Sequence, residues 1–295
     1  MRAIGKNILV FFLFWTGLAR IHRLLIQRRS VSIFILHNPE PNTFLELLTG
    51  LQKRYNFIAM EQLVEALQQG NFDALPKYAA VLTLDDGHKD NYALRNTLAK
   101  LIVPATLFVC SEIIDTNRHF WSNYPLSEAE FEKLKKLSHQ EMMLELQKLG
   151  FQPEKSYPDR HALSLKEILE MKSSGLVDFQ SHGQFHFILT KLDHAMVQEE
   201  ISNSKYTLEA LLKKGIEGFA YPNGEAEERE IDLTRKAGYR YCVTNYRGQV
   251  TKRSKLHSLP RIGLSDQGGF KENIVKASGV WNFFNRVYLK LQSTA

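Results

Sequence analysis

Aspartate and histidine residues follow several short apolar runs of this sequence. Residues 85–87 (DDG) come directly after VLTL, and residues 181–186 (SHGQFH) come directly after VDFQ. His37 follows SIFIL, and residues 222–224 (PNG) follow GFAY. Carboxylate and imidazole groups are the ligands that zinc and related divalent metals use in proteins. The repeated placement of these residue types therefore indicates metal chemistry.

One of the two aspartates at 85 and 86, together with His182 and His186, forms the candidate metal site. One Asp and two His leave an open coordination position, the arrangement that catalytic zinc requires. Water at such a position has a pKa of about 7. His182 and His186 are four residues apart, so a helical turn would put both imidazoles on one side. The other aspartate of the pair would stay free as a base, although DDG is also a common turn sequence.

The chain between these motifs alternates short apolar runs with amphipathic stretches. The runs are rich in Val, Ile, Phe and Tyr and predict seven strands, at 31–36, 79–84, 105–110, 177–180, 218–221, 239–244 and 259–263. The amphipathic stretches predict helices at 43–53, 60–69, 91–101, 127–149, 164–173, 194–214 and 225–237. This order is typical of an α/β fold, here an open or distorted (β/α) barrel of about seven parallel strands. In such a barrel the carboxyl ends of all strands meet on one face, where the motif residues would converge.

Residues 118–163 interrupt this alternation with a polar helical insert. Inserts of this kind either cover a site or form a surface excursion, and the sequence leaves both alternatives open. We expect two parts in the chain, a segment at 1–30 and a globular domain at 31–295 that contains the insert.

The positive charge of the chain is concentrated at its start. Lys and Arg number 38 and Asp and Glu number 32, which gives a net charge of +6. Residues 1–30 hold six of the basic residues and no acidic one, so the rest of the chain is neutral. No basic stripe is left to indicate nucleic acid binding, and nothing indicates an obligate protein partner. Only Cys110 and Cys242 are present, which excludes a disulfide scaffold.

Residues 8–19 (ILVFFLFWTGLA) form an apolar run of about 12 residues, shorter than the roughly 20 that cross a bilayer. Arginines flank the run and Trp15 lies within it, which favours a helix lying on the surface of an anionic membrane. An uncleaved membrane anchor and a helix packed on its own protein remain alternatives. Residues 281–291 mix aromatic and basic side chains. We expect this stretch either to lie on the same membrane face or to form a terminal helix docked on the protein.

Three strings of the sequence resemble the first three motifs of the polysaccharide deacetylases, the NodB-homology domains of carbohydrate esterase family four. They are TLDDG at 83–87, SHGQFH at 181–186 and FAYPNG at 219–224. The similarity covers roughly residues 31–264. It implies a distorted (β/α) barrel and a metal-dependent hydrolase that removes acetyl groups, N-acetyl above all, from a polysaccharide or oligosaccharide.

The resemblance also implies roles for individual residues. Asp85 would be the general base, and Asp86, His182 and His186 would hold the metal. This ligand set favours Zn2+ and would also accept Co2+, Ni2+, Mn2+ or Fe2+. The metal and a backbone N–H near Asn223 would stabilise the oxyanion. Two further residues are expected on the oxyanion and substrate side of the site, Tyr221 and Leu36.

The sequence departs from the family pattern in three places. No Leu-x-His strand follows Gly263, but residues 35–37 (ILH) look like the same unit in a circularly permuted arrangement. We therefore expect His37 to be the general acid, with His257 as the alternative and a structural strand-end histidine as the plain interpretation. The third motif has Ala220 where Arg is common, and Arg261 is expected to orient the base instead. The Asp-x-x-Asp-Trp motif is missing.

Two other functions remain open at this point. One is a catalytically inactive carbohydrate-binding relative, and the other is a different metal-dependent amidase or esterase on the same barrel. The remaining histidines that we considered are interpreted as surface residues or as neighbours of the site, namely His88, His139, His161 and His194.

Overall fold

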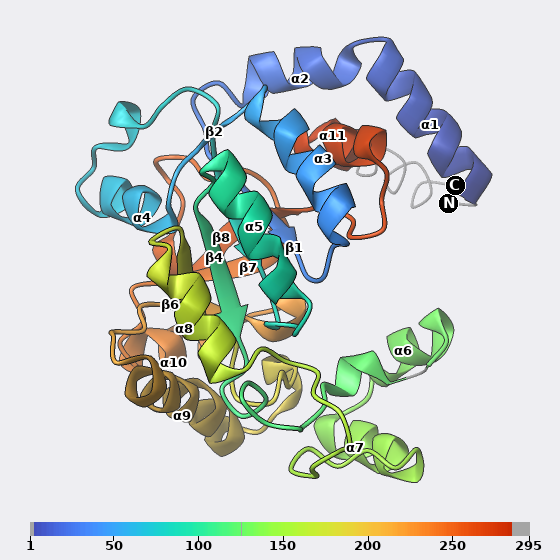
Figure 1. Ribbon diagram of the computed structural model, residues 1–295, viewed down its shortest axis with the longest axis vertical. Helices are drawn as coiled ribbons and strands as arrows, with labels where there is room; N and C mark the ends of the chain where they lie inside the picture. The colour runs from blue at the N-terminus through green and yellow to red at the C-terminus, as the bar shows by residue number, and fades with distance from the viewer. Residues whose placement is uncertain (1–2, 125, 285–295) are drawn as a thin grey trace.

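The computed structural model describes residues 3–124 and 126–284, and a parallel β-barrel forms its centre (Figure 1). The ring consists, in order, of β1 (Ser32–Leu36), β3 (Ala79–Leu84), β4 (Ala105–Val109), β5 (Val177–Ser181), β6 (Gly218–Ala220), β7 (Tyr241–Arg247) and β8 (Leu259–Gly263). The pairing of β8 with β1 closes the ring. The expected distorted (β/α) barrel is confirmed. The structure adds β2 (Asn56–Phe57), which pairs with the first residues of β3 and lies outside the ring.

Six helices follow the strands as the sequence predicts. They are α3 (Pro41–Gln52), α4 (Met60–Gln68), α5 (Asn91–Leu101), α8 (Leu165–Ser173), α9 (His194–Leu212) and α10 (Glu228–Lys236). Side-chain caps fix the first residues of α3, α8 and α9. At the start of α9, for example, the Asp193 carboxylate accepts a hydrogen bond from the Met196 N–H. Short 3₁₀ turns lie at Phe72–Ala74, Trp121–Asn123, Leu189–Lys191, Pro222–Gly224 and Leu256–Ser258.

Two apolar layers enclose the strands of the barrel. Alternate residues of the strands point inward and form the inner layer, among them Ile33, Val81, Phe108 and Val243. Their neighbours point outward and pack under the helices, among them Phe34, Leu82, Leu107 and Phe219. Because both faces are buried, these strands read as continuous apolar runs in the sequence. This continuity explains why the strands could be predicted closely.

The insert contains two helices where the sequence predicted one. The helix expected at 127–149 is wrong, because α6 (Glu128–Leu134) ends before a second capping box starts α7 (His139–Lys148). In that box the Ser138 hydroxyl accepts from the Glu141 N–H, and the Glu141 carboxylate accepts from the Ser138 N–H. Both helices lie at the end of the barrel toward which the β4 arrow points (Figure 1). The insert therefore borders the face where the strands end.

The N-terminal region forms two helices, α1 (Ala3–Trp15) and α2 (Leu18–Ile26), which are bent by 66° relative to each other. Gly17 lies at the bend with φ 75°, a left-handed conformation that glycine adopts readily. One face of α1 packs on α11 (Phe270–Ala277), where Leu13 and Val275 are buried. Among the described residues no single helix is long and apolar enough to cross a membrane; the bent pair meets both criteria only when its helices are taken together.

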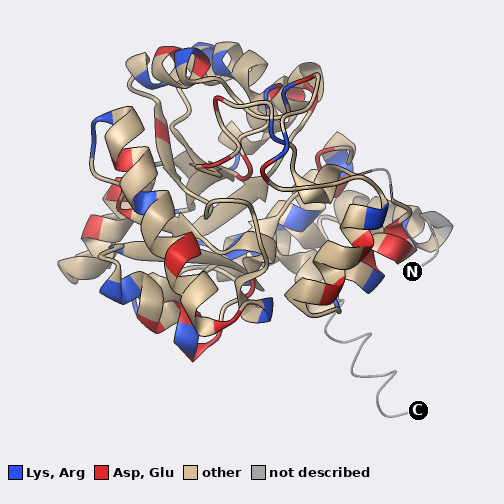
Figure 2. Ribbon diagram, turned by 90° about the horizontal axis from the view of Figure 1, so that it is seen from below, with Lys and Arg blue, Asp and Glu red and all other residues tan. Residues whose placement is uncertain are grey.

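The other face of these two helices is apolar and exposed. Its members are Ile8, Phe11, Phe12, Trp15, Ile21, Leu24, Leu25 and Ile26. The helix pair α1 and α2 thus packs on the protein body with one face and exposes apolar side chains on the other. Figure 2 shows acidic and basic residues interspersed over the helices that surround the barrel. Of the predicted stretch 281–291, residues 285–291 lie outside the described residues, and the division of the chain at residue 30 stays a prediction.

Candidate active site

The side chains of Asp86, His182 and His186 meet at the carboxyl end of the barrel. Asp86 Oδ1 lies 3.4 Å from His182 Nε2 and 3.2 Å from His186 Nε2. All three side chains are buried. The sequence expected these residues to converge, and the structure brings them together from the loops after β3 and β5.

The donor atoms of this cluster fit a bound cation. His182 Nδ1 lies 2.7 Å from the carbonyl oxygen of Ala220, and a carbonyl only accepts, so this nitrogen carries the proton. In the neutral imidazole, Nε2 then presents a lone pair toward Asp86 Oδ1. That oxygen is buried and has no hydrogen-bond partner within the described part of the chain. Lone pairs that face each other in a buried site are stabilised by a positive ion between them.

A strained turn aims the Asp86 carboxylate. Asp86 has φ 71° and Gly87 has φ 79°, so two consecutive residues are left-handed. A Cβ on Gly87 would lie 2.7 Å from Val109 Cγ1, which only glycine avoids. Left-handed backbone at a non-glycine residue costs about 1–3 kcal/mol and is concentrated at functional sites. The DDG sequence therefore forms a tight turn and, through that turn, positions a candidate metal ligand.

The loop with both histidines is irregular, and the expected helical turn between them is wrong. His186 has φ 62°, and residues 182–188 contain no helix. The Glu200 carboxylate of α9 accepts hydrogen bonds from the N–H groups of Gln184 (2.7 Å) and Phe185 (3.4 Å). The indole N–H of Trp121 donates to the carbonyl of His186 at 2.8 Å. Two residues from distant elements thus replace a helix as the support of this loop.

Sequence reasoning missed Glu200 as a support residue. Glu200 lies on the same face of α9 as the buried Val197, Ile201 and Ser204, and only 3% of its surface is exposed. Burial raises the pKa of this carboxyl group to about 7. A charged residue among apolar ones at helical spacing was the signal that could have revealed it.

His88 supports the other oxygen of Asp86. Its Nε2 lies 3.1 Å from Asp86 Oδ2, and its side chain is buried against Phe120. His88 is therefore a neighbour of the site and not a surface residue. The contact leaves Asp86 Oδ1 as the oxygen that faces the two imidazoles.

Asp85 forms a paired contact with Arg261. The two guanidinium nitrogens Nη1 and Nη2 donate to Oδ1 and Oδ2 of Asp85, each at 2.7 Å. Arg261 Nε also donates to the carbonyl of Thr244 at 3.1 Å. Burial acts to raise the pKa of Asp85, but the charge and the hydrogen bonds of Arg261 outweigh it, so the pKa is lowered. The third motif has Ala220 where an arginine is common. Arg261, from β8, makes the contact with Asp85 instead.

His37 lies beside this pair at the mouth of the barrel. β1 and β3 are paired with Leu36 opposite Leu84, which places His37 beside Asp85 in the register. The His37 side chain is 44% exposed, and its Nδ1 lies 3.8 Å from Asp266 Oδ2. The alternative residue His257 precedes β8 and thus lies at the opposite end of the parallel barrel, where its Nε2 contacts the carbonyl of Tyr239. His257 does not belong to this face.

The three residues expected on the oxyanion and substrate side have different positions. Asn223 follows β6 at the correct end with φ 59°, and its side-chain amide donates to Glu225 at 2.7 Å. The side chains of Tyr221 and Leu36 lie fully buried in the outer apolar layer. The Tyr221 hydroxyl is hydrogen-bonded to Thr234, so neither side chain borders the open face. The expectation for these two side chains is therefore corrected.

The fold and site together define a parallel α/β barrel with clustered carboxylate and imidazole groups at its carboxyl end. A family model described as polysaccharide deacetylase matches residues 73–242. The match covers more than half of the chain, and the chain belongs to this family.

Individual relatives agree with this membership. A poly-beta-1,6-N-acetyl-D-glucosamine N-deacetylase of Staphylococcus aureus is 27% identical over 144 residues, 46% of this chain and 48% of the relative. A protein of the same name from Staphylococcus epidermidis is 29% identical over 119 residues, 38% of this chain and 41% of the relative. The matches thus span less than half the length of these curated relatives.

Solved structures show the same fold. The structure of IcaB from Ammonifex degensii has a TM-score of 0.63 at 17% identity and covers 86% of this chain and 99% of that chain. The Streptococcus pyogenes deacetylase PplD, solved in complex with acetate, has a TM-score of 0.62 at 21% identity and covers 84% of this chain and 98% of that chain. At these identities the likeness concerns the fold alone.

Proposed function

We propose that this protein is a metal-dependent N-deacetylase of an acetylated amino-sugar polymer. The observation that carries the proposal is the approach of Asp86 Oδ1 to the Nε2 atoms of His182 and His186, beside Asp85. The names of the relatives suggest poly-β-1,6-N-acetyl-D-glucosamine as the substrate class.

Asp86, His182 and His186 would hold the divalent ion. The partnerless Asp86 Oδ1 and the fixed tautomer of His182 fit this role. Mixed nitrogen and oxygen ligands favour Zn2+, and Co2+, Ni2+, Mn2+ or Fe2+ suit the same set. A bound ion of this kind supplies Lewis acidity, which activates water and polarises an acyl oxygen near neutral pH.

Asp85 would accept the proton of the attacking water. Two hydrogen bonds from Arg261 fix the plane of its carboxylate and keep it ionised. A general base must lie within hydrogen-bond reach of the proton that it takes, so a fixed plane contributes directly to the rate.

His37 would protonate the leaving amine. It stands half-exposed at the barrel mouth, and the Asp266 carboxylate beside Nδ1 would orient the ring. The backbone N–H near Asn223 would stabilise the charge that develops on the acyl oxygen. Each step thus has a residue at the carboxyl end of the barrel.

Acetate release tests this function. The full chain is incubated with N-acetylated β-1,6-linked glucosamine oligosaccharides and, separately, with O-acetylated sugars, before and after treatment with a chelator. We expect acetate from the N-acetylated series, loss of activity with the chelator and recovery with zinc. Release from the O-acetylated series alone would favour another esterase on this barrel. Binding without any release would favour an inactive carbohydrate-binding relative.

We also propose that α1 and α2 attach the protein to a membrane surface. Trp15 and Phe11 are more than half exposed on an apolar face that the protein body leaves uncovered. Six basic residues and no acidic residue occur in residues 1–30, which favours anionic lipids. Trp and Phe side chains typically anchor such helices at the interface between water and lipid.

A further inference from the structure

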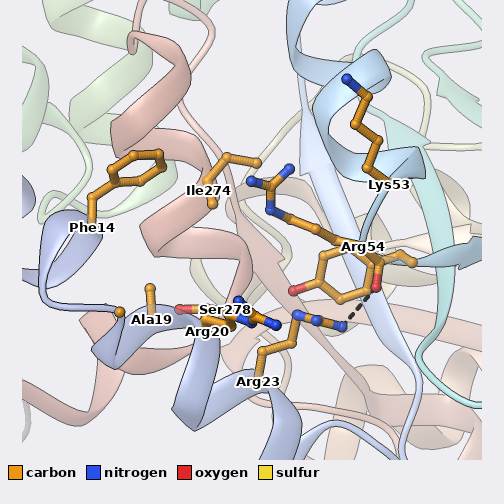
Figure 3. A pocket seen from close by; sticks show the side chains of 10 residues that line it. Phe14, Ala19, Arg20, Arg23, Lys53, Arg54, Ile274 and Ser278 are labelled. Carbon is orange, nitrogen blue, oxygen red and sulfur yellow. Dashed lines mark hydrogen bonds between the residues drawn. The ribbon is translucent and has the colours of Figure 1, made fainter.

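A cavity of about 500 Å³ lies between α2, the end of α3 and α11, away from the metal cluster. Four basic side chains line it, and no aspartate or glutamate does. Figure 3 shows Arg20 and Arg23 on α2, and Lys53 and Arg54 on the segment after α3. Phe14 and Ile274 add an apolar wall.

Among the lining residues that the structure describes, the like charges in this cavity have no acidic counterpart. Arg23 donates to the carbonyl of Arg54 at 2.8 Å, and Arg54 donates to the carbonyl of Gly50 at 2.7 Å. Among the described residues, the side chains of Arg20 and Lys53 form neither a hydrogen bond nor an ion pair, so both remain available to a ligand. Burial and the Arg23 charge lower the pKa of Arg54. An anion in the cavity would relieve this repulsion.

Phosphate is the anion that this arrangement fits. Planar guanidinium groups bind phosphate oxygens through two parallel hydrogen bonds, and a lysine adds a point charge. The cavity is large enough for a phosphate group together with a small polar head, because its volume lies in the ordinary range of ligand sites.

The surroundings of the cavity indicate a lipid as the source of the phosphate. Arg20 and Leu24 are four residues apart in α2 and share one helix face. Leu24 belongs to the exposed apolar face described above, which continues to Leu25, 75% exposed. A cationic cavity at the edge of an apolar surface is complementary to a molecule with a phosphate head and hydrocarbon chains.

We infer that this cavity binds the phosphate group of an anionic membrane lipid whose acyl chains lie along the exposed face of α1 and α2. The inference rests on the proposed attachment of the same helices to a membrane. Without this cavity, the attachment would depend only on non-specific attraction between basic residues and anionic lipids and on apolar contact. The inference adds a specific binding site for one lipid.

Vesicle binding of the full chain tests the inference. The double variant Arg20→Gln/Lys53→Gln removes two charges that support no contact of the fold. The double variant Arg28→Gln/Arg29→Gln removes two charges from the same segment outside the cavity. With vesicles of phosphatidylcholine and phosphatidylglycerol, we expect the cavity variant to lose about tenfold more affinity than the control variant, equal to about 1.4 kcal/mol. Thermal unfolding verifies that both variants are folded.

The other outcomes separate the cavity from general attachment. Equal losses in both variants would overturn the cavity and leave membrane attachment intact. The cavity would also be overturned, with membrane attachment intact, if the wild type bound pure phosphatidylcholine vesicles as tightly as vesicles that contain phosphatidylglycerol. Titration with inorganic phosphate and glycerol phosphate forms a separate arm. If these soluble anions bind to the cavity while no vesicle binds, the lipid source and the membrane attachment both fail.

Discussion

The guanidinium group of Arg261 and the carboxylate of Asp85 form two hydrogen bonds of 2.7 Å inside the barrel. Asp85 follows β3, Arg261 belongs to β8, and β1 pairs with both strands. The contact therefore spans the place where the barrel closes. Both groups are almost fully buried, so each charge compensates the other in the interior.

Replacing Arg261 by Lys tests the geometry of this pair. One ammonium group cannot reproduce two parallel hydrogen bonds. We expect kcat to fall about 100-fold while the protein stays folded. Arg261→Ala leaves a buried carboxylate unpaired and should lower the free energy of unfolding by about 3–5 kcal/mol. Acetate release and urea unfolding measure both effects. The exposed Arg247 pairs with Arg261 in the sheet register, and Arg247→Lys, the control, should change neither quantity.

Replacing Asp85 by Asn tests the general base. Asn keeps the size of the side chain but cannot take a proton. We expect the metal content to stay stoichiometric and kcat to fall by about 10²–10⁴. Metal analysis and acetate release measure the two quantities on the same sample. Near-normal turnover would remove Asp85 from the base role.

Replacing Asp86 or His186 by Ala tests the metal ligands. Each change removes one of three protein ligands, and we expect the purified variant to retain no zinc after dialysis. The exposed His194 at the start of α9 provides the control His194→Ala, which should retain zinc like the wild type. A stoichiometric zinc content in Asp86→Ala would contradict the ligand assignment.

Replacing Glu200 by Gln gives a prediction with a pH dependence. The pKa of Glu200 is raised to about 7, whereas an unfolded Glu has a pKa of about 4.3. Between these values the folded chain keeps a proton that the unfolded chain has lost, so stability falls as pH rises. Gln does not ionise, and its Oε1 accepts the same N–H groups. We expect Glu200→Gln to match the wild type near pH 5 and to exceed it at pH 8 by up to about 3 kcal/mol.

Urea unfolding of metal-free protein at the two pH values checks this prediction. Glu199→Gln changes an exposed neighbour on the same helix and should leave the pH dependence unaltered. If Glu200→Gln were less stable than the wild type at pH 8, the ionised carboxylate would be the form that supports the histidine loop.

Replacing Phe11 and Trp15 by Ser tests the attachment of α1. Both side chains are more than half exposed, and Trp15 contacts only Phe11, Phe14 and Lys271 among the ring contacts of the described residues, so the free energy of unfolding should change little. Burial of one such side chain in lipid contributes about 1.5–3 kcal/mol, so we expect vesicle affinity to fall at least about tenfold. The control Tyr206→Ser removes an equally exposed aromatic group from α9. Unchanged sedimentation with vesicles would defeat the attachment.

The barrel could be predicted because each strand is buried on two faces and is followed by a turn residue. This double burial gives the apolar runs, and parallel order then brings Asp86, His182 and His186 to one end. β2 has only two residues, which is too short for a periodic signal. The break between α6 and α7 was visible in Ser138 and Glu141, but the helical periodicity on both sides obscured it.

The shape of the histidine loop could not be predicted from local sequence. H-x-x-x-H spacing suits a helix, yet the loop takes its form from Glu200 and Trp121, which are distant in the chain. His257 could be excluded as the general acid only once the direction of β8 was known, because that direction places it at the opposite end of the barrel. Positions after a strand were predictable, whereas contacts between elements were determined by packing.

Barrel closure also sets an order of events during synthesis. Arg261 leaves the ribosome 176 residues after Asp85. Until it arrives, the other six strands of the ring have an acidic group without its arginine partner, and β1 lacks its second neighbour. A chain that ends before β8 therefore lacks both the strand that closes the ring and the arginine that holds Asp85.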